Sequence, residues 1–519
     1  MWQQSYAPVA GSLALSTLVA AAPIVVLLLL LAVARRPAWV ASLAGLGAAG
    51  ILAGAVYGMP LGQLFASIAY GAAFGLFPIG WVVFTAILLY RVTVESGKFE
   101  ILKDSIANLT TDRRLQALLI AFAFGAFIEG AAGFGTPVAV AGAMLAGLGF
   151  TPFYAAAICL LANTAPVAFG SIAIPITTLA LTTGLPVDRL SAGVGRMCAP
   201  VSLFVPAYLI LVMSGWEGLR AVFPAAAVCG IAFAGTQFAV SNFVGPQLTD
   251  ILASMAAMGS LVALIRIWRP EAAQRGTKTA REVLLAWTPY ILLVIFVLTW
   301  GELQPQLNKT NIAIPWPMLH NAILRVPPAV AKPAPYAAMY TFGWLSASGT
   351  ACLIAAILSA LVVGLKPRQF VSVIGQTSRQ LAKAELTLAA VLALAFLMNY
   401  SGATATLGLA FAATGVMFPF FSALLGWLGV FLTGSDTSAN ALFGTLQVVT
   451  AHKLSMNPVL MAAANSSGGV MGKMISLTSI CVAAAATSMK KGEEALLFRF
   501  TLRHSMFLAS VICLIAMFY

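Results

Sequence analysis

Long uncharged apolar stretches constrain this chain more than any other feature. One of them covers residues 13–34, and ~20 apolar residues are what an α-helix needs to cross a bilayer. It is too long for the apolar core of a typical signal peptide, and no small-residue cleavage site clearly follows it, so we expect a retained first helix. Of the 519 residues, 61% are hydrophobic and 8% are charged, against roughly 25% charged in a soluble domain. Because the runs are continuous rather than alternating, they predict an all-α integral membrane protein and not a barrel.

Apolar segments follow one another along the whole chain and predict a single transmembrane domain over residues 1–519. Their lengths predict roughly 12–14 spans, some of them broken or re-entrant, in a polytopic helical bundle. Residues 302–335 are expected to form an outer loop. A similar order of acidic, Phe-Gly-Thr, Pro and Asn-Ser/Thr features in both halves suggests inverted repeats over residues 63–265 and 336–519. The spacings differ, so chance similarity in these Ala- and Gly-rich segments is the alternative.

The basic residues are gathered in a few places, although the net charge of +13 is high. The clusters can all be placed on one side of a membrane, which is the positive-inside pattern. This distribution predicts a lipid bilayer rather than nucleic acid as the partner, with the N- and C-termini on the outer side. The clusters are Arg35 and Arg36; Arg91, Lys98, Lys103, Arg113 and Arg114; Arg266, Arg269, Arg275, Lys278 and Arg281; Lys366, Arg368, Arg379 and Lys383; and Lys490, Lys491, Arg499 and Arg503.

Two acidic residues, Glu129 and Asp436, lie inside apolar stretches and within runs of small residues. A carboxylate at membrane depth is costly, so its default interpretation is a functional site that faces a cavity. Three roles are open: a proton carrier, because a desolvated carboxyl can exchange protons near neutral pH; a ligand of a cation such as Na⁺; or a structural helix cap. We predict proton coupling, with Asp436 first. Helix breaks are expected at Gly130, Gly133, Gly135 and Gly434.

Two polar runs, one in each half, predict a site for an anion. Residues 163–166 read Asn-Thr-Ala-Pro and residues 465–469 read Asn-Ser-Ser-Gly-Gly. Each can stop one helix and begin another, and a helix N-terminus with free N–H groups binds a carboxylate. The alternative is close helix packing through small residues. We expect the two runs to approach each other near mid-membrane. The predicted substrate-binding residues are Asn163, Thr164, Ala165, Asn465, Ser466, Ser467 and Gly468.

Lys473 follows the second polar run and is also predicted to bind substrate. A lysine within an apolar segment must pair or reach water. It can meet an anionic substrate, pair with Asp436 or Glu129, or extend its side chain to the interface. Asp250 fits a simple helix start better than a site, which leaves Glu129 and Asp436 as the expected membrane carboxylates.

The sequence favours no enzyme and no metal or cofactor site. The six cysteines stand at unrelated spacings in apolar segments, and the three histidines are scattered. Residues 133–137 lack the Gly-Lys-Ser/Thr of a phosphate-binding loop, which argues against ATP-driven transport. A non-transporting membrane sensor or scaffold is the alternative of a different class, but no signalling domain is recognisable.

Four stretches resemble the lactate permease family, which includes glycolate permeases. They are residues 129–138 (EGAAGFGTPV), 149–175 with CLLANTAPVAFGSIAIPI, 432–446 (LTGSDTSANALFGTL) and 465–476 (NSSGGVMGKMIS). The resemblance extends over nearly the whole chain. It implies a secondary transporter that imports lactate, glycolate or related 2-hydroxy monocarboxylates, usually with protons, across a bacterial inner membrane. Sodium coupling is the runner-up. The chain is also distantly similar to ion-transporter-superfamily folds with inverted repeats and re-entrant hairpins.

One departure from that family stands directly after the fourth stretch. Where the family typically reads Pro-Gln-Ser, this chain has Leu477, Thr478 and Ser479. The local backbone break and the substrate preference are therefore open at this point.

Overall fold

The computed structural model describes residues 1–107, 109–133, 135–268, 279–330, 332–490 and 493–519. Several residues used above lie outside this set. They are Phe134 in the first glycine-rich run and Arg269, Arg275, Lys278 and Lys491 in the basic clusters.

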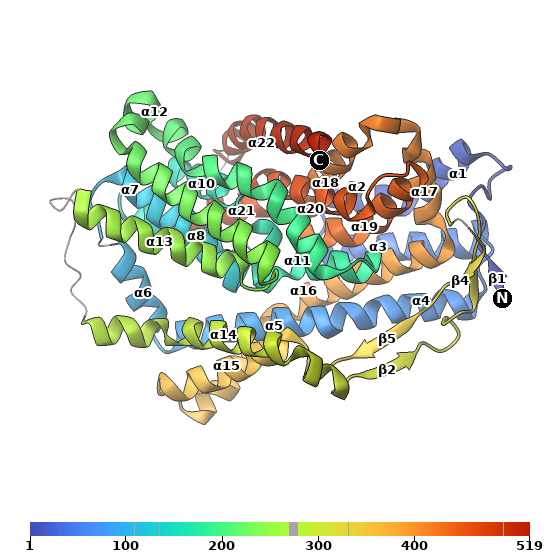
Figure 1. Cartoon of the computed structure of the whole chain (residues 1–519), viewed down its shortest axis with the longest axis horizontal. Helices are drawn as coiled ribbons and strands as arrows, with labels where there is room; N and C mark the ends of the chain where they lie inside the picture. The colour runs from blue at the N-terminus through green and yellow to red at the C-terminus, as the bar shows by residue number, and fades with distance from the viewer. Residues whose placement is uncertain (108, 134, 269–278, 331, 491–492) are drawn as a thin grey trace.

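Helices make up most of the described structure (Figure 1). Among the described residues, ten helices are long and apolar enough to cross a membrane, or up to twelve if two bent helix pairs each count as one span. The predicted all-helical membrane architecture with broken helices is confirmed. The lower end of the predicted span number is reached only when the bent pairs are counted, because several apolar segments fold as short or interrupted helices.

One layer of the molecule consists of the N-terminal helices and the middle of the chain. In Figure 1, α4, α5, α14 and α15 run along its lower side, and the helix contacts join α4 to α16, α5 to α15 and α14 to α15. The elements are α1 (Leu13–Ala20), α2 (Ala22–Ala32), α3 (Ala38–Ile51), η1 (Leu52–Val56), α4 (Leu61–Phe74), η2 (Gly75–Gly80), α5 (Trp81–Glu95), α6 (Lys98–Ala107), α14 (Ala280–Leu307), η6 (Asn308–Thr310), α15 (Ser348–Val362) and α16 (Pro367–Ser401).

The other layer contains two helix groups that are far apart in sequence and packed together. Contacts between α11 and α19, and between α12 and α20, join them. The first group is α7 (Arg113–Gln116), η3 (Ala117–Phe124), α8 (Gly125–Ala131), α9 (Thr136–Gly147), α10 (Pro152–Ala162), η4 (Val167–Phe169), α11 (Gly170–Thr183), α12 (Val187–Phe243) and α13 (Thr249–Trp268). The second is α17 (Ala403–Phe411), η7 (Ala412–Met417), α18 (Phe418–Thr433), α19 (Asp436–Lys453), α20 (Pro458–Gly472), η8 (Lys473–Ile475), α21 (Leu477–Ala486) and α22 (Glu493–Phe518).

The two bent pairs occupy corresponding places in these groups. α10 meets the segment of η4 and α11 at 67°, and α20 with η8 meets α21 at 43°. Each pair follows a helix break at glycines with positive φ, namely Gly133 and Gly135 in the first group and Gly434 in the second. The order of break, helix and bent pair therefore occurs in both groups. The limits of the repeats, residues 63–265 and 336–519, stay a prediction.

The predicted outer loop folds as a small β cap. β2 (Ile312–Pro315) pairs antiparallel with β5 (Met339–Phe342), and β3 (Ile323–Arg325) pairs antiparallel with β4 (Ala334–Pro335). The N-terminal β1 (Trp2–Gln3) joins β3 in parallel, with Trp2 opposite Ile323. Figure 1 shows this cap at the right-hand end of the molecule beside the N-terminus. The pairing places the N-terminus on the same side as the loop.

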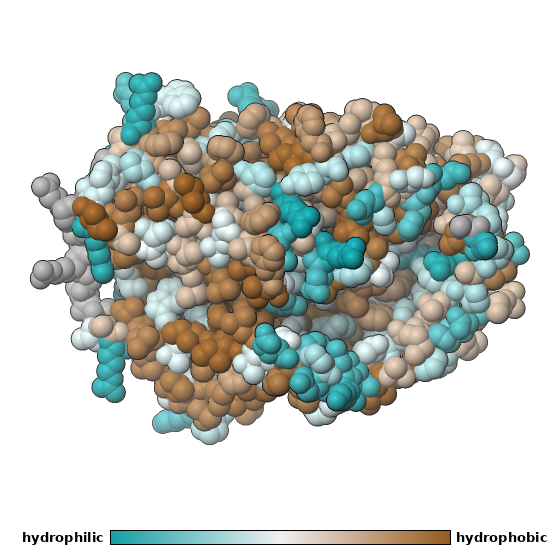
Figure 2. All heavy atoms as spheres, viewed as in Figure 1, coloured by the Kyte–Doolittle hydropathy of each residue, from teal (hydrophilic) through white to brown (hydrophobic). Residues whose placement is uncertain are grey.

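Apolar side chains cover much of the molecular surface. Figure 2 shows them over most of the left half of one face, whereas polar side chains gather toward the middle and the cap end. A surface of this kind suits lipid contact, because a soluble protein rarely exposes contiguous apolar patches above a few hundred Å².

Candidate functional site

A cavity of about 250 Å³ lies where the breaks of the two helix groups meet. Its wall contains Glu129, Asp436 and Lys473, together with the break glycines Gly135 and Gly434. Pockets for drug-sized ligands measure roughly 300–1,000 Å³, so this cavity suits a smaller molecule. Two acids and one lysine that are far apart in sequence thus share one cavity.

The first break follows α8. Gly133 has φ of 58° and Gly135 has φ of 82°, and the chain then enters α9. L-residues rarely adopt this backbone conformation, so glycine is needed to turn the chain here. The expected break at Gly130 is wrong, because this residue lies inside α8. The absence of a side chain at Gly130 instead lets α13 pack closely, since a Cβ there would lie 2.9 Å from the Cβ of Asp250.

Asp436 begins α19 but does not cap it. Ser435 is the N-cap residue, and its hydroxyl accepts a hydrogen bond from the Ser438 N–H at 3.2 Å. The Asp436 side chain is buried, and its Oδ2 accepts hydrogen bonds from Ser466 Oγ at 2.7 Å and Asn440 Nδ2 at 3.2 Å. Its other oxygen, Oδ1, has no hydrogen-bond partner among the described residues. The structural-cap alternative is therefore wrong for this residue.

Polar side chains link α19 to α20 behind Asp436. Asn465 Nδ2 donates to Asn440 Oδ1 at 2.9 Å, and Gln447 Nε2 donates to Asn465 Oδ1 at 3.0 Å. Asn440 Nδ2 also donates to the Pro175 carbonyl at 3.2 Å, which ties α11 to the same group. These side chains are fully buried. The network therefore holds the Asp436 carboxylate in one position.

The expected break at residues 465–469 is wrong. These residues are helical within α20, and the chain breaks later, at η8. The side chains of Asn465 and Ser466 bond to α19 rather than cap a new helix, which leaves the helical backbone intact. Ser476 caps α21 instead, accepting from Ser479 N–H at 3.2 Å. Gly468 lies against the Ala423 backbone of α18, so the close-packing alternative describes it.

Lys473 lies at this later break, and its side chain reaches across the cavity. Its Nζ donates to the Gly434 carbonyl at 2.7 Å. It is close enough to Glu129 and Asp436 to interact electrostatically with both. The ion pairs between described residues are Lys103–Glu100 and Arg114–Asp112, so Lys473 forms no close ion pair with either acid. An ammonium has three donors, and the Gly434 carbonyl takes one of them.

The Glu129 side chain, on α8, lies against the start of α11. A Cβ on Gly170 would lie 2.6 Å from Glu129 Oε1, so only glycine allows this approach. The next three residues, Ser171, Ile172 and Ala173, all have φ between 47° and 59°. Successive left-handed residues are strained, and such strain gathers at functional sites. Ser171 Oγ donates to the Ala132 carbonyl at 2.9 Å and thereby ties this turn to the end of α8.

The first polar run does form the tip of a bent pair. Asn163 ends α10, and its amide lies beside Glu129, although neither of its polar atoms meets hydrogen-bond geometry within the described structure. Thr164 Oγ1 bonds back to the Leu161 carbonyl at 2.7 Å, and the Ala165 carbonyl accepts from Gln237 Nε2 at 3.1 Å. η4, just after this run, contacts α20, the helix that carries the second polar run. The approach of the two runs near mid-membrane stays a prediction.

The predicted substrate-binding residues divide into two sets. Lys473 lines the cavity, while the others are not among its lining residues. Those others are Asn163, Thr164, Ala165, Asn465, Ser466, Ser467 and Gly468.

Sequence reasoning missed several polar residues of the cavity wall. Eight hydroxyl side chains line it, and α3 and α16 of the other layer contribute Ala38 and Thr387. All of these hydroxyls except Thr387 stand next to helix breaks, which is the signal that could have found them. The seven are Ser171, Thr433, Ser435, Thr437, Ser438, Thr478 and Ser479. Thr478 and Ser479 belong to the segment that departs from the lactate permease pattern.

Two further acids in apolar surroundings were also missed. Asp250 is 1% exposed, and neither of its carboxylate oxygens has a hydrogen-bond partner among the described residues. Glu385 on α16 faces Gly80, and its Oε1 has no hydrogen-bond partner among the described residues. The expectation that Glu129 and Asp436 are the only membrane carboxylates is therefore wrong. Asp250 resembles an ordinary helix start in sequence, so no local signal separates it.

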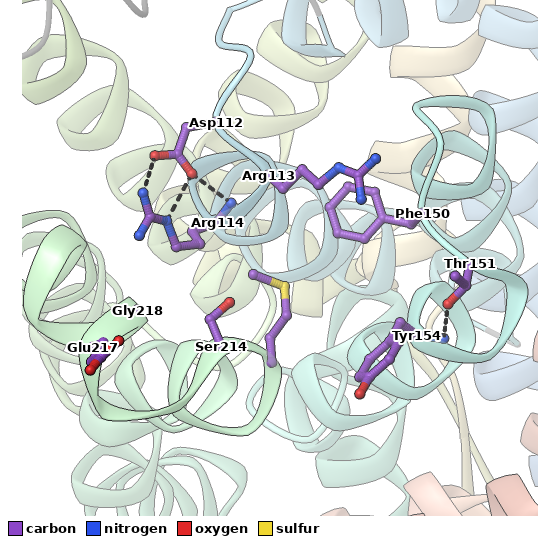
Figure 3. Close-up of a pocket in the computed structure, with 10 residues that line it drawn as sticks. Asp112, Arg113, Arg114, Phe150, Thr151, Tyr154, Ser214, Glu217 and Gly218 are labelled. Atoms are coloured by element: carbon purple, nitrogen blue, oxygen red, sulfur yellow. Dashed lines mark hydrogen bonds and ion pairs between the residues drawn. The ribbon is translucent and has the colours of Figure 1, made fainter.

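A second hollow, of about 680 Å³, shares no lining residue with the central cavity. Figure 3 shows Arg113 extending toward Phe150, and the guanidinium lies 5.6 Å from the ring centroid. Arg114 is bonded to Asp112 through two contacts of 2.8 and 3.0 Å. The two arginines of this hollow are therefore engaged by neighbouring side chains, Arg113 by Phe150 and Arg114 by Asp112.

The chain matches the family model described as L-lactate permease over residues 16–519. It is 44% identical to the L-lactate permease of Bacillus subtilis, covering 99% of this chain and 97% of that protein. It is 43% identical to the glycolate permease GlcA of Escherichia coli, with the same coverage. A solved structure, the Alcanivorax borkumensis YdaH transporter, covers 87% of this chain and 86% of its own at TM-score 0.44 and 14% identity, too distant to bear on function. The chain therefore belongs to the L-lactate permease family.

Proposed function

We propose that this protein is a secondary transporter that imports lactate-like 2-hydroxy monocarboxylates, such as lactate and glycolate, by proton symport. The observation that carries the proposal is the single small cavity that holds Lys473 with Glu129 and Asp436. Similarity to L-lactate and glycolate permeases supports the substrate class. We place the protein in a bacterial inner membrane with both termini on the periplasmic side.

The cavity chemistry suits a small hydroxy acid. A lysine ammonium with free donors attracts a carboxylate, and hydroxyls and backbone groups at helix breaks can bond a neighbouring 2-hydroxyl group. Thr478 and Ser479 supply hydroxyls next to Lys473 in the cavity wall. We therefore assign the substrate carboxylate to Lys473, with the polar runs behind the wall as its support.

Charge balance supports a co-transported cation. Moving one negative charge into a cell with a negative interior costs ~2.3 kcal/mol per 100 mV. A proton cancels that charge and also draws on the pH gradient. Glu129 and Asp436 both face the cavity, so either carboxyl can exchange a proton with water there.

Sodium coupling is the second candidate. Asp436, Thr437 and Ser438 line the same cavity, and hard cations prefer oxygen ligands such as carboxylates and hydroxyls. Groups of three or more His, Cys, Asp or Glu side chains that could hold a metal are absent from the described residues. Uptake under separate gradients distinguishes Na⁺ from a proton as the co-transported cation.

The test is uptake of labelled lactate and glycolate into proteoliposomes under separately imposed pH and Na⁺ gradients. We expect an inward proton gradient to drive accumulation, and a Na⁺ gradient at equal pH to have no effect. Accumulation under the Na⁺ gradient alone would replace the proton with sodium. Counterflow no higher than in empty liposomes, with folded protein, would refute transport of these acids.

A further inference from the structure

Asp250 is a buried acid that the cavity does not explain. It stands in the first turn of α13 and is 1% exposed. Within the described residues, neither oxygen accepts a hydrogen bond, so the side chain caps no helix. Burying a carboxylate costs several kcal/mol, and this cost must be offset by a partner or by a bound proton. The part of the chain that the structure describes provides no hydrogen-bond partner for it, so a structural role alone does not account for this residue.

The carboxyl that faces Asp250 is Glu129. α8 and α13 pack against each other at Gly130, the residue after Glu129, and a Cβ on Gly130 would lie 3.1 Å from the Ile251 nitrogen. The two acids are close enough for direct electrostatic repulsion. Glu129 also lines the cavity, whereas Asp250 is buried and is not among the lining residues. The pair therefore leads from the cavity into the packed interior.

The other groups around Asp250 carry no compensating positive charge. α13 packs against α8, α12, η3 and α11. The titratable groups that face Asp250 are Glu129 from α8 and the Cys198 thiol from α12, and Cys198 in turn faces Asp436. η3 and α11 contain no titratable side chain. Lys473 interacts with Glu129 and Asp436. Two neighbouring carboxyls in such surroundings cannot both be ionised without a large cost.

We propose that Asp250 is a coupling residue that shares the transported proton with Glu129, an assignment that rests on the proposed proton symport. The pair always holds one resident proton. This proton passes from the Glu129 carboxyl to the Asp250 carboxylate: one O–H bond breaks at Glu129 while another forms at Asp250, so the transfer needs no other reactant. The Glu129 carboxylate that remains then takes up a second proton on the cavity side, and this second proton enters and leaves with the substrate.

The test compares Asp250→Asn with Asp188→Asn in proteoliposomes that contain a pH-sensitive dye. Asp188 is a matched control because it also lies in the first turn of a helix, α12, but is exposed. We expect Asp250→Asn to lose lactate-driven proton influx and pH-driven accumulation while keeping lactate counterflow. Asp188→Asn should retain all three activities. Asp250→Glu keeps an acid in a changed position and should transport with a shifted pH profile.

The outcomes separate this assignment from the proposed function. If the unmodified protein moves lactate without protons, proton symport itself is wrong. If it couples normally and Asp250→Asn has the same proton-to-lactate ratio and pH profile, the role of Asp250 is wrong. Should Asp250→Asn fail to fold, an unchanged pH profile of the folded Asp250→Glu variant would overturn the assignment equally.

Discussion

The charged side chains Lys473 and Asp436 in the cavity wall have different proposed roles. Lys473 is the one cation in the described cavity wall, where it bonds to the Gly434 carbonyl, and Asp436 is fixed by bonds from Ser466 and Asn440. The lysine thus keeps donors for an anion, while the acid keeps one free oxygen. These roles are assigned to side chains whose positions depend on neighbours far away in sequence.

Replacing Lys473 tests the assigned carboxylate contact. A hydrogen bond to a charged group is worth about 1.5–3 kcal/mol, so Lys473→Ala should raise the apparent KM about ten- to hundredfold. Lys473→Arg should rescue poorly, because a guanidinium differs from an ammonium in size and geometry. The measurement is the concentration dependence of lactate uptake. The exposed Lys453 supplies the control variant Lys453→Ala, and equal KM values for the two alanine variants would contradict the contact.

Neutral variants of the two cavity acids test coupling. Asp436→Asn and Glu129→Gln should each abolish accumulation driven by a pH gradient, because an amide cannot carry the proton. Exchange of internal for external lactate should continue, since exchange does not require proton release. Asp436→Asn keeps an oxygen that can accept from Ser466, so the fold should survive. If both variants accumulate lactate with unchanged pH dependence, the proton passes elsewhere.

At the scale of elements, close contacts between glycines and backbone set the position of α20. Gly468 and Gly472 of α20 face backbone atoms of α18, and Gly426 of α18 faces the Asn465 carbonyl. Small residues let membrane helices approach in this way. Because α20 carries Ser466 and leads directly into Lys473, its position determines the shape of the cavity wall.

A methyl group in this contact should move α20. Gly426→Ala would place its Cβ on the Asn465 backbone, and overpacking costs about 1–3 kcal/mol. We therefore expect a lower Tm in detergent together with reduced lactate uptake. Gly259→Ala on α13 is the matched control, because a Cβ there meets nothing within 4 Å. A Tm for Gly426→Ala equal to that of this control would show that the contact does not constrain α20.

Across the whole molecule, the β cap and the basic clusters should lie on opposite sides of the membrane. β1 pairs with β3, so the N-terminus belongs to the cap side. The described basic clusters flank helices that are long enough to span. From the positive-inside rule we therefore expect the cap outside the cell.

Labelling of single cysteines tests this topology. Cys481 is the exposed native cysteine and is first replaced by serine. Met318 in the cap is 67% exposed, so Met318→Cys should react with a membrane-impermeant thiol reagent added to intact cells. Lys366→Cys, in a basic cluster, should react only after the cells are opened. Labelling of Lys366→Cys in intact cells would invert the assigned orientation.

The sequence by itself determined the membrane class, the helical architecture and the two main acids. Its apolar runs lie in a bilayer, where no water can bond the backbone, so the backbone must form helices. Glu129 and Asp436 stand out because charged residues are rare in those runs. Glycine-rich breaks at Gly133, Gly135 and Gly434 were equally readable, since positive φ favours glycine. These properties depend on local composition, which the sequence contains directly.

Only the tertiary structure decided which polar residues matter and how. Asp188 and Asp250 both stand in the first turn of a helix, yet one is exposed and the other is buried beside Glu129. Asn465 has the residue type of a helix cap but bonds to α19 within a continuous helix. The partner of a polar side chain depends on which distant helix packs against it, and a contact across hundreds of residues leaves no local pattern in the sequence.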